Sequence, residues 1–291
     1  MVTFADRLST RTRELGHPLC LGLDPYLERI PEMFRGRNEP ATVRSFLLAV
    51  LELARERVAI VKPQISLFER MGIGGLEVLA ELIEQARSHG LLVLLDAKRG
   101  DIGHTAMGYA QAYLSPNGFL DVDAVTVSPY MGRDAIEPFV EVAAAHGRGV
   151  VVLVRNSNPG ADRFQTLSID GRPLFEVVAC SLAGFEARLM GGEGWSSLAV
   201  TTSALAPDDS IRIRRCLPHA LFLVLGYGAQ GGGARGAVAG LERTPAGYEG
   251  GVVNSSRGVL YPPGARSARG SDWEMALSAA LSRAIHDLQG V

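Results

Sequence analysis

The chain has 291 residues, of which 47% are hydrophobic and 21% are charged, so it can build a substantial apolar core and is not a disordered protein. Its formal net charge of −2 excludes the overall positive field that attracts nucleic acid or an anionic membrane. We therefore expect no nucleic-acid or membrane partner, and any anionic ligand must be bound by a local site.

The cysteines and the N-terminal segment both indicate a cytoplasmic protein. Cys20, Cys180 and Cys216 are far apart and odd in number, which argues against a disulfide framework and against a cysteine-based metal site. The first residues have a helical apolar rhythm without the features of a secretory signal. The longest apolar runs are too short to span a bilayer.

Eight short runs of β-branched and aliphatic residues recur along the chain, and each ends in polar or Gly-rich residues. Such runs are typical of strands buried on both faces of a parallel sheet. They begin at residues 18, 58, 91, 123, 149, 197, 220 and 251.

Segments with helical spacing separate these runs, and they lie at residues 42–57, 75–88, 134–146, 174–189 and 272–288. This alternation predicts an α/β fold, a (β/α)8 TIM barrel, as a single domain over residues 1–291. A doubly wound open sheet is the alternative, but it would use fewer strands per domain, and no linker divides the chain. Residues 156–195 are the expected place for an added loop over the site.

Charged residues stand where the first three apolar runs end, at Asp24, Lys62, and Asp96 with Lys98. In barrel enzymes the chemistry is built at the C-terminal ends of the strands. Asp96 and Lys98 are two apart in a strand, so their side chains leave the same face. With Asp101 in the next turn and Lys62 on the neighbouring strand, two lysines and two aspartates can alternate and keep one another ionised. A purely structural ion-pair network remains an alternative interpretation.

A Gly-rich segment follows the seventh run, and Arg257 follows the eighth. In such barrels these two loops commonly bind phosphate. Gly228 and Gly231 allow close backbone approach, Gln230 can donate its amide, and Arg257 can contact phosphate oxygens. The sequence therefore predicts a phosphorylated substrate.

Other interpretations of these residues are weaker. Gly226, Gly228 and Gly231 also fit the G-x-G-x-x-G dinucleotide-binding motif. That motif, however, belongs to the first strand-helix turn of a nucleotide-binding domain and needs an acidic residue at the end of the next strand. The next run here ends in Asn254 and Ser255. A ligand-free Gly-rich turn is a further alternative. The six histidines show no metal-ligand spacing, so we expect no metal site.

Six segments, in order and at the expected strand ends, together resemble the orotidine 5′-phosphate decarboxylase family, and most closely its longer bacterial subgroup. They are 22-GLDP, 61-VKPQ, 95-LDAKRGDIGHT, 155-RNSNPGA, 225-LGYGAQGG and 254-NSSRG. The resemblance implies a homodimer that decarboxylates orotidine 5′-monophosphate to uridine 5′-monophosphate in pyrimidine biosynthesis. It also implies that no metal or organic cofactor takes part.

The resemblance further implies a catalytic role for each member of the charged cluster. Lys98 matches the general acid that protonates C6 of the pyrimidine. Asp96 matches the carboxylate placed against the substrate carboxylate, and Lys62 completes the network. Asp101 matches a residue that the other subunit contributes.

It implies binding roles for the remaining site residues in the same way. Asp24 matches a ribose contact within its own chain, and Thr105 matches one from the partner chain. Ser157 matches the contact to the pyrimidine amide edge, while Gln230 and Arg257 match the phosphate grip. The chain departs from the family pattern at 200-VTTSA, Asn156, Leu225 and His104, all outside the Asp/Lys network.

Three rival functions share parts of this residue pattern. A magnesium-dependent sugar-phosphate decarboxylase or hexulose-phosphate synthase would reuse the same barrel, but a lysine beside Asp96 disfavours a divalent cation. A Schiff-base aldolase would need a lysine with a lowered pKa, which flanking carboxylates oppose. A non-catalytic nucleotide-phosphate sensor would need only Gln230 and Arg257.

Overall fold

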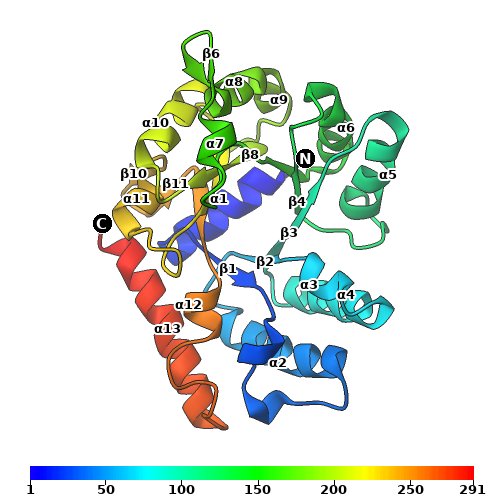
Figure 1. Ribbon diagram of the computed structural model, residues 1–291, viewed down its shortest axis with the longest axis vertical. Coiled ribbons are helices and arrows are strands. Elements are labelled where there is room, and N and C mark those ends of the chain that lie inside the picture. The colour runs from blue at the N-terminus through cyan, green and yellow to red at the C-terminus, as the bar shows by residue number, and fades with distance from the viewer.

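Eight parallel strands close into a barrel in the computed structural model, which describes residues 1–291 (Figure 1). The order around the barrel is β1-β12-β9-β8-β5-β4-β3-β2. The eight apolar runs of the sequence form these strands, so the predicted TIM barrel is confirmed. The strands are β1 Leu19–Leu23, β2 Ile60–Pro63, β3 Leu92–Arg99, β4 Ala124–Val127, β5 Gly149–Val152, β8 Ser196–Ser203, β9 Ala220–Leu225 and β12 Gly251–Ser255.

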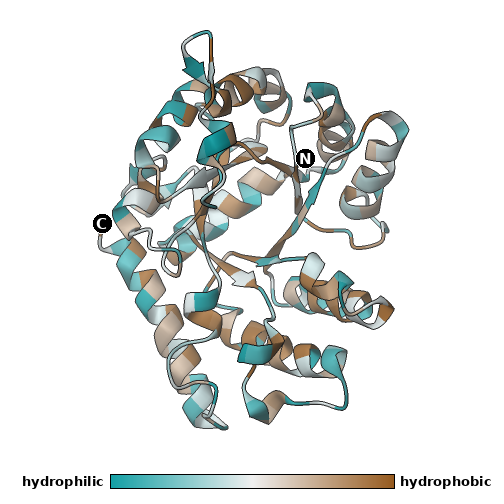
Figure 2. Cartoon of the chain, viewed as in Figure 1, coloured by the Kyte–Doolittle hydropathy of each residue, from teal (hydrophilic) through white to brown (hydrophobic).

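The strands are buried on both faces, which explains their unbroken apolar texture. Side chains such as Leu94, Val151 and Leu223 fill the barrel interior. Their neighbours in the sequence, such as Leu95 and Val150, face outward and join a larger cluster with the surrounding helices. In Figure 2 the strands are accordingly mostly brown, while the helices carry both colours.

Helices surround the barrel and connect consecutive strands. The predicted segments 42–57, 75–88, 134–146 and 272–288 correspond to α2, α4, α6 and α13. The helices are α1 Phe4–Leu15, α2 Glu39–Ala54, α3 Ser66–Glu69, α4 Ile73–Ser88, α5 Gly103–Leu114, α6 Glu137–His146, α7 Asp162–Gln165, α8 Leu174–Ser181, α9 Ala183–Arg188, α10 Pro207–Cys216, α11 Ala234–Val238, α12 Arg257–Leu260 and α13 Ser271–Gln289. None of them combines the length and the apolar character needed to cross a membrane.

Helix α1 closes the N-terminal end of the barrel. Thr3 and Asp6 form a capping box that fixes the start of this helix. Its residues Phe4 and Leu8 then join the interior cluster. The packing is tight, because a Cβ added to Gly149 would lie 2.4 Å from Cδ1 of Phe4. The opposite end of the barrel, where the strands finish, is left for the site.

Residues 156–195 are more structured than the predicted loop. They contain α7, a small hairpin of β6 (Ser168–Ile169) and β7 (Arg172–Pro173), and then α8 and α9. The helix predicted over 174–189 is therefore two helices that break at Leu182. A second hairpin, β10 (Glu242–Thr244) with β11 (Gly247–Glu249), was not predicted.

Cys180 and Cys216 form a disulfide between α8 and the last residue of α10, with their Cα atoms 4.8 Å apart. The sequence argument against a disulfide is therefore wrong for this pair. Cys20 stays free and buried inside the barrel.

Candidate active site

Three charged side chains meet at the C-terminal ends of β2 and β3. The Nζ atom of Lys62 donates to Oδ2 of Asp96 at 3.0 Å, and the ammonium of Lys98 donates to Oδ1 of the same carboxylate. Lys62 and Asp96 are buried, whereas the side chain of Lys98 is 44% exposed. The sequence prediction that Lys62, Asp96 and Lys98 lie together is thus met, and Lys98 is the member that reaches open space.

Burial and charge act in opposite directions on this cluster. Burial alone would raise the pKa of Asp96, but the ammonium groups of Lys62 and Lys98 lower it to about 2. Burial alone would lower the pKa of Lys62, but Asp96 and then Asp24 raise it above its ordinary value. Asp96 is therefore an anion and Lys62 a cation at neutral pH.

Thr126 on β4 fixes the turn that carries Lys98, and the sequence reasoning missed it. Its hydroxyl donates to Oδ1 of Asp96 at 3.1 Å and accepts from the backbone N–H of Ala97 and of Lys98. Lys98 has a φ of 49°, in the left-handed region, and the β3–β4 register shifts between Leu95 and Arg99. Thr126 therefore stabilises a backbone turn that a regular strand would not make.

Asp24 lies at the end of β1, beside Lys62. Its Oδ1 atom is buried and has no hydrogen-bond partner in the chain. Its backbone carbonyl accepts a hydrogen bond of 2.8 Å from the hydroxyl of Tyr261, which also accepts one from the N–H of Tyr26. The segment is therefore held in place, and the unpartnered oxygen is available to a ligand hydroxyl.

Asp101 and Thr105 do not join the charged cluster of their own chain. The carboxylate of Asp101 accepts a hydrogen bond from the N–H of Ile102 at 2.8 Å, and Thr105 is exposed in the first turn of α5. The alternation of two lysines with Asp96 and Asp101 is thus absent within one chain. Ile102, between the two residues, is 54% exposed.

Ser157 lies beside the start of the Gly-rich loop that follows β9. A Cβ added to Gly226 would lie 3.0 Å from the Cβ of Ser157. The ends of β5 and β9, which are not neighbours in the barrel, therefore bring Ser157 and this loop together.

The Gly-rich loop is folded back on itself. Gly228 and Gly231 have φ values of 69° and 98°, and no atom lies within 4 Å of an added Cβ at either one, so conformation and not space requires glycine there. Their N–H groups donate within the loop, to Gly232 and Gly228 respectively. The N–H groups of these two glycines are therefore not free for phosphate, and the close backbone approach expected there stays a prediction.

The free donors come from two other residues of this loop and from the loop after β12. The N–H groups of Ala229 and Gln230 make no hydrogen bond in the chain, and neither does the guanidinium of Arg257. Gly228 and Gly258 line one cavity of about 370 Å³, which places the loops after β9 and β12 side by side. This group of donors suits an anion.

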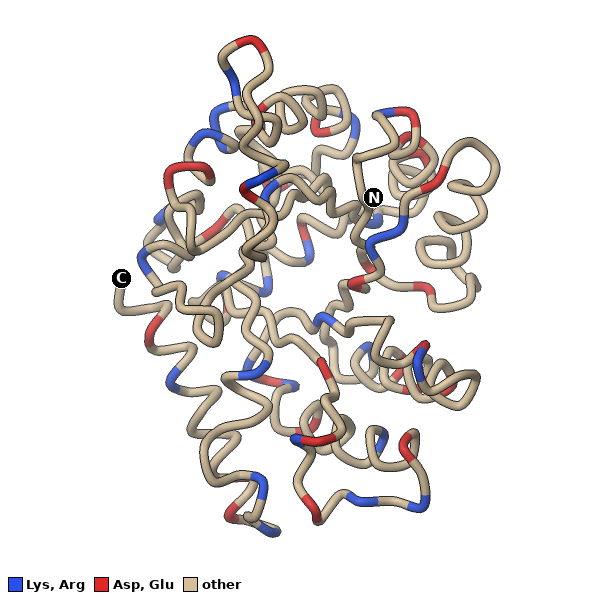
Figure 3. Tube along the Cα trace, viewed as in Figure 1, with Lys and Arg blue, Asp and Glu red and all other residues tan.

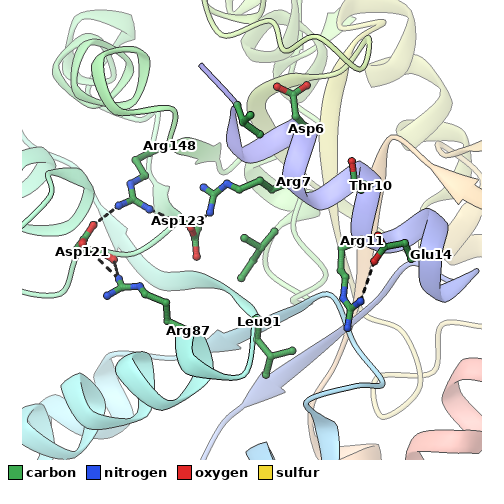
Figure 4. Close-up of a pocket in the computed structure, with 13 residues that line it drawn as sticks. Asp6, Arg7, Thr10, Arg11, Glu14, Arg87, Leu91, Asp121, Asp123 and Arg148 are labelled. Carbon is green, nitrogen blue, oxygen red and sulfur yellow. Dashed lines mark hydrogen bonds and ion pairs between the residues drawn. The ribbon is translucent and has the colours of Figure 1, made fainter.

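A larger cavity, of about 660 Å³, lies elsewhere (Figure 4). It is next to α1, at the N-terminal end of the barrel. There Arg148 pairs with Asp121 and Asp123, and Arg7 pairs with Asp123 at 2.6 Å. Because these charges are mutually satisfied and lie at the end opposite the strand termini, we assign the cavity to the seal formed by α1 and not to catalysis. Figure 3 shows that positively and negatively charged residues are interspersed along the whole chain.

A closed (β/α)8 barrel with a buried ion cluster at the C-terminal ends of its strands defines the class of barrel enzymes. A family model described as the orotidine 5′-phosphate decarboxylase / HUMPS family matches residues 17–268. The chain belongs to that family.

Individual relatives agree over nearly the whole chain. Orotidine 5′-phosphate decarboxylase of Rhodopirellula baltica is 36% identical over 308 residues, covering all of both chains. The enzyme of the same name from Deinococcus radiodurans is 38% identical over 280 residues, covering 96% of this chain and 95% of the relative. The structure of Leishmania donovani OMP decarboxylase matches with a TM-score of 0.77 and 28% identity, covering 99% of this chain and 98% of the other.

Proposed function

We propose that this chain is a carboxy-lyase that converts orotidine 5′-monophosphate to uridine 5′-monophosphate in pyrimidine biosynthesis, with Lys98 as the general acid. Membership of the family supports the reaction. The observation that carries the assignment of residues is the Lys62–Asp96–Lys98 cluster, in which a half-exposed ammonium stands at the end of a buried ion pair.

The chemistry requires a cation at one carbon. When the bond from C6 to the carboxylate breaks, carbon dioxide leaves and the electron pair remains in an in-plane orbital at C6, where the ring delocalises it poorly. A preplaced ammonium stabilises that charge more in the transition state than in the ground state. Lys98 then transfers a proton to C6 and regains one from solvent.

Asp96 and Lys62 keep Lys98 in place. Asp96 stays ionised because its pKa is lowered to about 2, so its carboxylate continues to accept the hydrogen bonds from Lys62 and from Lys98. A carboxylate at this position also faces the departing carboxylate of the substrate. Any destabilisation of the ground state from that proximity is secondary in our proposal.

The remaining residues bind the nucleotide. Asp24 supplies its unpartnered oxygen to a ribose hydroxyl, and Ser157 contacts the amide edge of the pyrimidine. Gln230 and Arg257 bind the phosphate. Because the phosphate lies far from C6, its binding energy is available to close and desolvate the site.

We also propose a cytoplasmic homodimer in which Asp101 and Thr105 serve the partner's active site. One observation supports this arrangement. Both residues lie away from the charged cluster of their own chain, where Asp101 accepts a hydrogen bond only from the N–H of Ile102 and Thr105 is exposed.

The rival functions are less consistent with the geometry. A magnesium-dependent sugar-phosphate enzyme needs free carboxylate oxygens, but both oxygens of Asp96 already accept from ammonium groups. A nucleotide-phosphate sensor has no use for a buried lysine-aspartate pair at the strand ends, and such a pair is costly to desolvate.

The test is the loss of ultraviolet absorbance when orotidine 5′-monophosphate is added to the pure protein, with and without EDTA. We expect the same turnover in both. Turnover that disappears with EDTA and returns with magnesium would contradict the metal-free mechanism. No turnover of this nucleotide would contradict the proposed reaction, and nucleotide binding without turnover would support the sensor.

A further inference from the structure

Arg155, just after β5, is a charged residue that is only 7% exposed and has no role in the reaction as proposed. Its Nε atom donates to Oδ2 of Asp209 at 2.8 Å, and an Nη atom donates to Asp162. The other Nη atom lies 3.4 Å from both the carbonyl of Asn156 and Oε1 of Gln165. One guanidinium therefore contacts four residues.

These contacts join three separate parts of the chain. Asp162 begins α7, and Asp209 lies in the first turn of α10, which follows β8. The backbone N–H of Arg155 donates to the carbonyl of Thr201 on β8 at 3.1 Å. Arg155 thus connects the segment after β5 to the β8–α10 unit on its neighbouring strand.

The residue after Arg155 strengthens the same connection. Asn156 accepts a hydrogen bond from the hydroxyl of Thr201 at 3.2 Å, and its N–H donates to Oε1 of Gln165 at 2.9 Å. Residues 155 to 165 are therefore held at both ends.

Ser157 lies within this held segment, and its own side chain makes no hydrogen bond in the chain. Its position beside Gly226 is consequently set by its neighbours and not by its own contacts. Any displacement of residues 156 to 165 moves Ser157 relative to the nucleotide.

We propose that Arg155 is a positioning residue, which holds Ser157 at the distance from the Gly226 loop that the pyrimidine edge requires. The inference rests on the proposed function, because that function supplies the pyrimidine. A buried ion network that served stability alone would be replaceable by apolar side chains of similar volume at little cost to binding. Positioning predicts instead a loss confined to ligands that carry the base.

The experiment measures affinity for two probes, uridine 5′-monophosphate and ribose 5-phosphate, by calorimetry on the full chain. The variants are Arg155→Met, Ser157→Ala and the double variant. We expect Arg155→Met and Ser157→Ala each to lower the affinity for uridine 5′-monophosphate by about tenfold, the scale of one or two hydrogen bonds. Ribose 5-phosphate, which has no base, should bind equally to all variants.

The double variant carries the decisive comparison. If Arg155 acts through Ser157, the double variant binds uridine 5′-monophosphate no more weakly than Ser157→Ala. Losses that multiply in the double variant, or a loss of ribose 5-phosphate affinity equal to that of the nucleotide, would overturn the proposal.

Arg148→Met is the matched control. Arg148 also bridges two aspartates, Asp121 and Asp123, but at the opposite end of the barrel (Figure 4). We expect it to lower thermal stability while leaving the affinity for uridine 5′-monophosphate unchanged. An equal loss of affinity in Arg148→Met would show that the effect of Arg155→Met is general destabilisation.

Asp162→Asn covers the case in which Arg155→Met does not fold. The side chain of Asp162 is 69% exposed, so its replacement removes one contact of Arg155 at little risk to the core. It should lower the affinity for uridine 5′-monophosphate by a smaller factor than Arg155→Met does, and it should not lower that affinity in the Ser157→Ala background. An undiminished effect in that background would contradict the proposal.

Nucleotide binding without turnover in the wild type would overturn the proposed reaction alone, because these affinities do not depend on catalysis.

Discussion

The ammonium of Lys62 lies 3.0 Å from Oδ2 of Asp96, and both side chains are more than nine-tenths buried. Removing the charge of Asp96 would leave the Lys62 ammonium without its hydrogen-bonded carboxylate in a poorly solvated place, and breaking a buried pair in this way typically costs about 3–5 kcal/mol. The pair therefore forms a fixed base for Lys98, whose half-exposed ammonium alone is placed to meet a substrate.

Lys98→Ala should abolish turnover while a tight analogue of uridine 5′-monophosphate still binds measurably. The reason is that the lysine acts mainly on charge that develops in the transition state. Steady-state rates and inhibitor titration give the two quantities. Near-wild-type turnover in this variant would remove Lys98 from the mechanism.

Arg257→Ala should lower kcat/KM for orotidine 5′-monophosphate by about 2 kcal/mol, the scale of a charge-assisted hydrogen bond. Arg257 has no partner within the chain, so the substitution leaves no protein charge unpaired. The control is orotidine without the phosphate, whose slow turnover should hardly change. Equal losses with both substrates would mean that Arg257 does not contact the phosphate.

A mixture of Lys98→Ala and Asp101→Ala chains should recover activity that neither variant has alone. If Asp101 serves the partner's site, a mixed dimer has one site with both residues intact and one site that lacks both. Random reassociation makes half of the dimers mixed, so about a quarter of the wild-type activity per site should return.

The assay for this complementation is made after the two variants are unfolded and refolded together, with each refolded alone for comparison. If the dimers exchange and mixing restores nothing, Asp101 acts in its own chain or not at all. The shared-site arrangement would then be wrong.

His17 should make the fold sensitive to moderate acid. It is buried, its Nδ1 accepts a hydrogen bond from the N–H of Leu19, and burial lowers its pKa from 6.5 to about 4. Between pH 6.5 and 4 the unfolded chain holds a proton on this histidine that the folded chain does not. The free energy of unfolding therefore falls as the pH drops through this window, by about 3 kcal/mol in total.

Urea unfolding at pH 7, 5.5 and 4 measures this dependence. His17→Asn keeps an acceptor for the Leu19 N–H but cannot be protonated there, so its unfolding free energy should depend less on pH. The exposed His146→Asn is the control and should follow the wild type. Identical pH dependence in His17→Asn and the wild type would exclude His17 as the cause.

The barrel and the core of its site could be predicted because both follow from local pattern. Continuous apolar runs indicate parallel strands, and a spacing of two placed Asp96 and Lys98 on one face. Thr126 was missed because a threonine inside an apolar strand is an ordinary strand residue, and only the fold brings it to Asp96. The disulfide was missed because Cys180 and Cys216 become neighbours only when α8 packs on α10. The contact of Thr126 and the disulfide can thus be recognised only from tertiary contacts, which the sequence pattern does not contain.

The barrel is closed by pairing between β1 and β12, where Cys20 opposes Asn254 across 234 residues of sequence. A chain made on the ribosome emerges N-terminus first. The strands β2 and β3, which carry Lys62 and Asp96, are therefore synthesised well before β12, the last strand of the barrel. Until β12 is inserted, β1 and β9 are open edges whose unpaired backbone groups can capture another chain. A chain truncated before Gly251 lacks β12. We therefore expect it to form an open sheet with two unpaired edge strands and to aggregate, and not to form a smaller active enzyme.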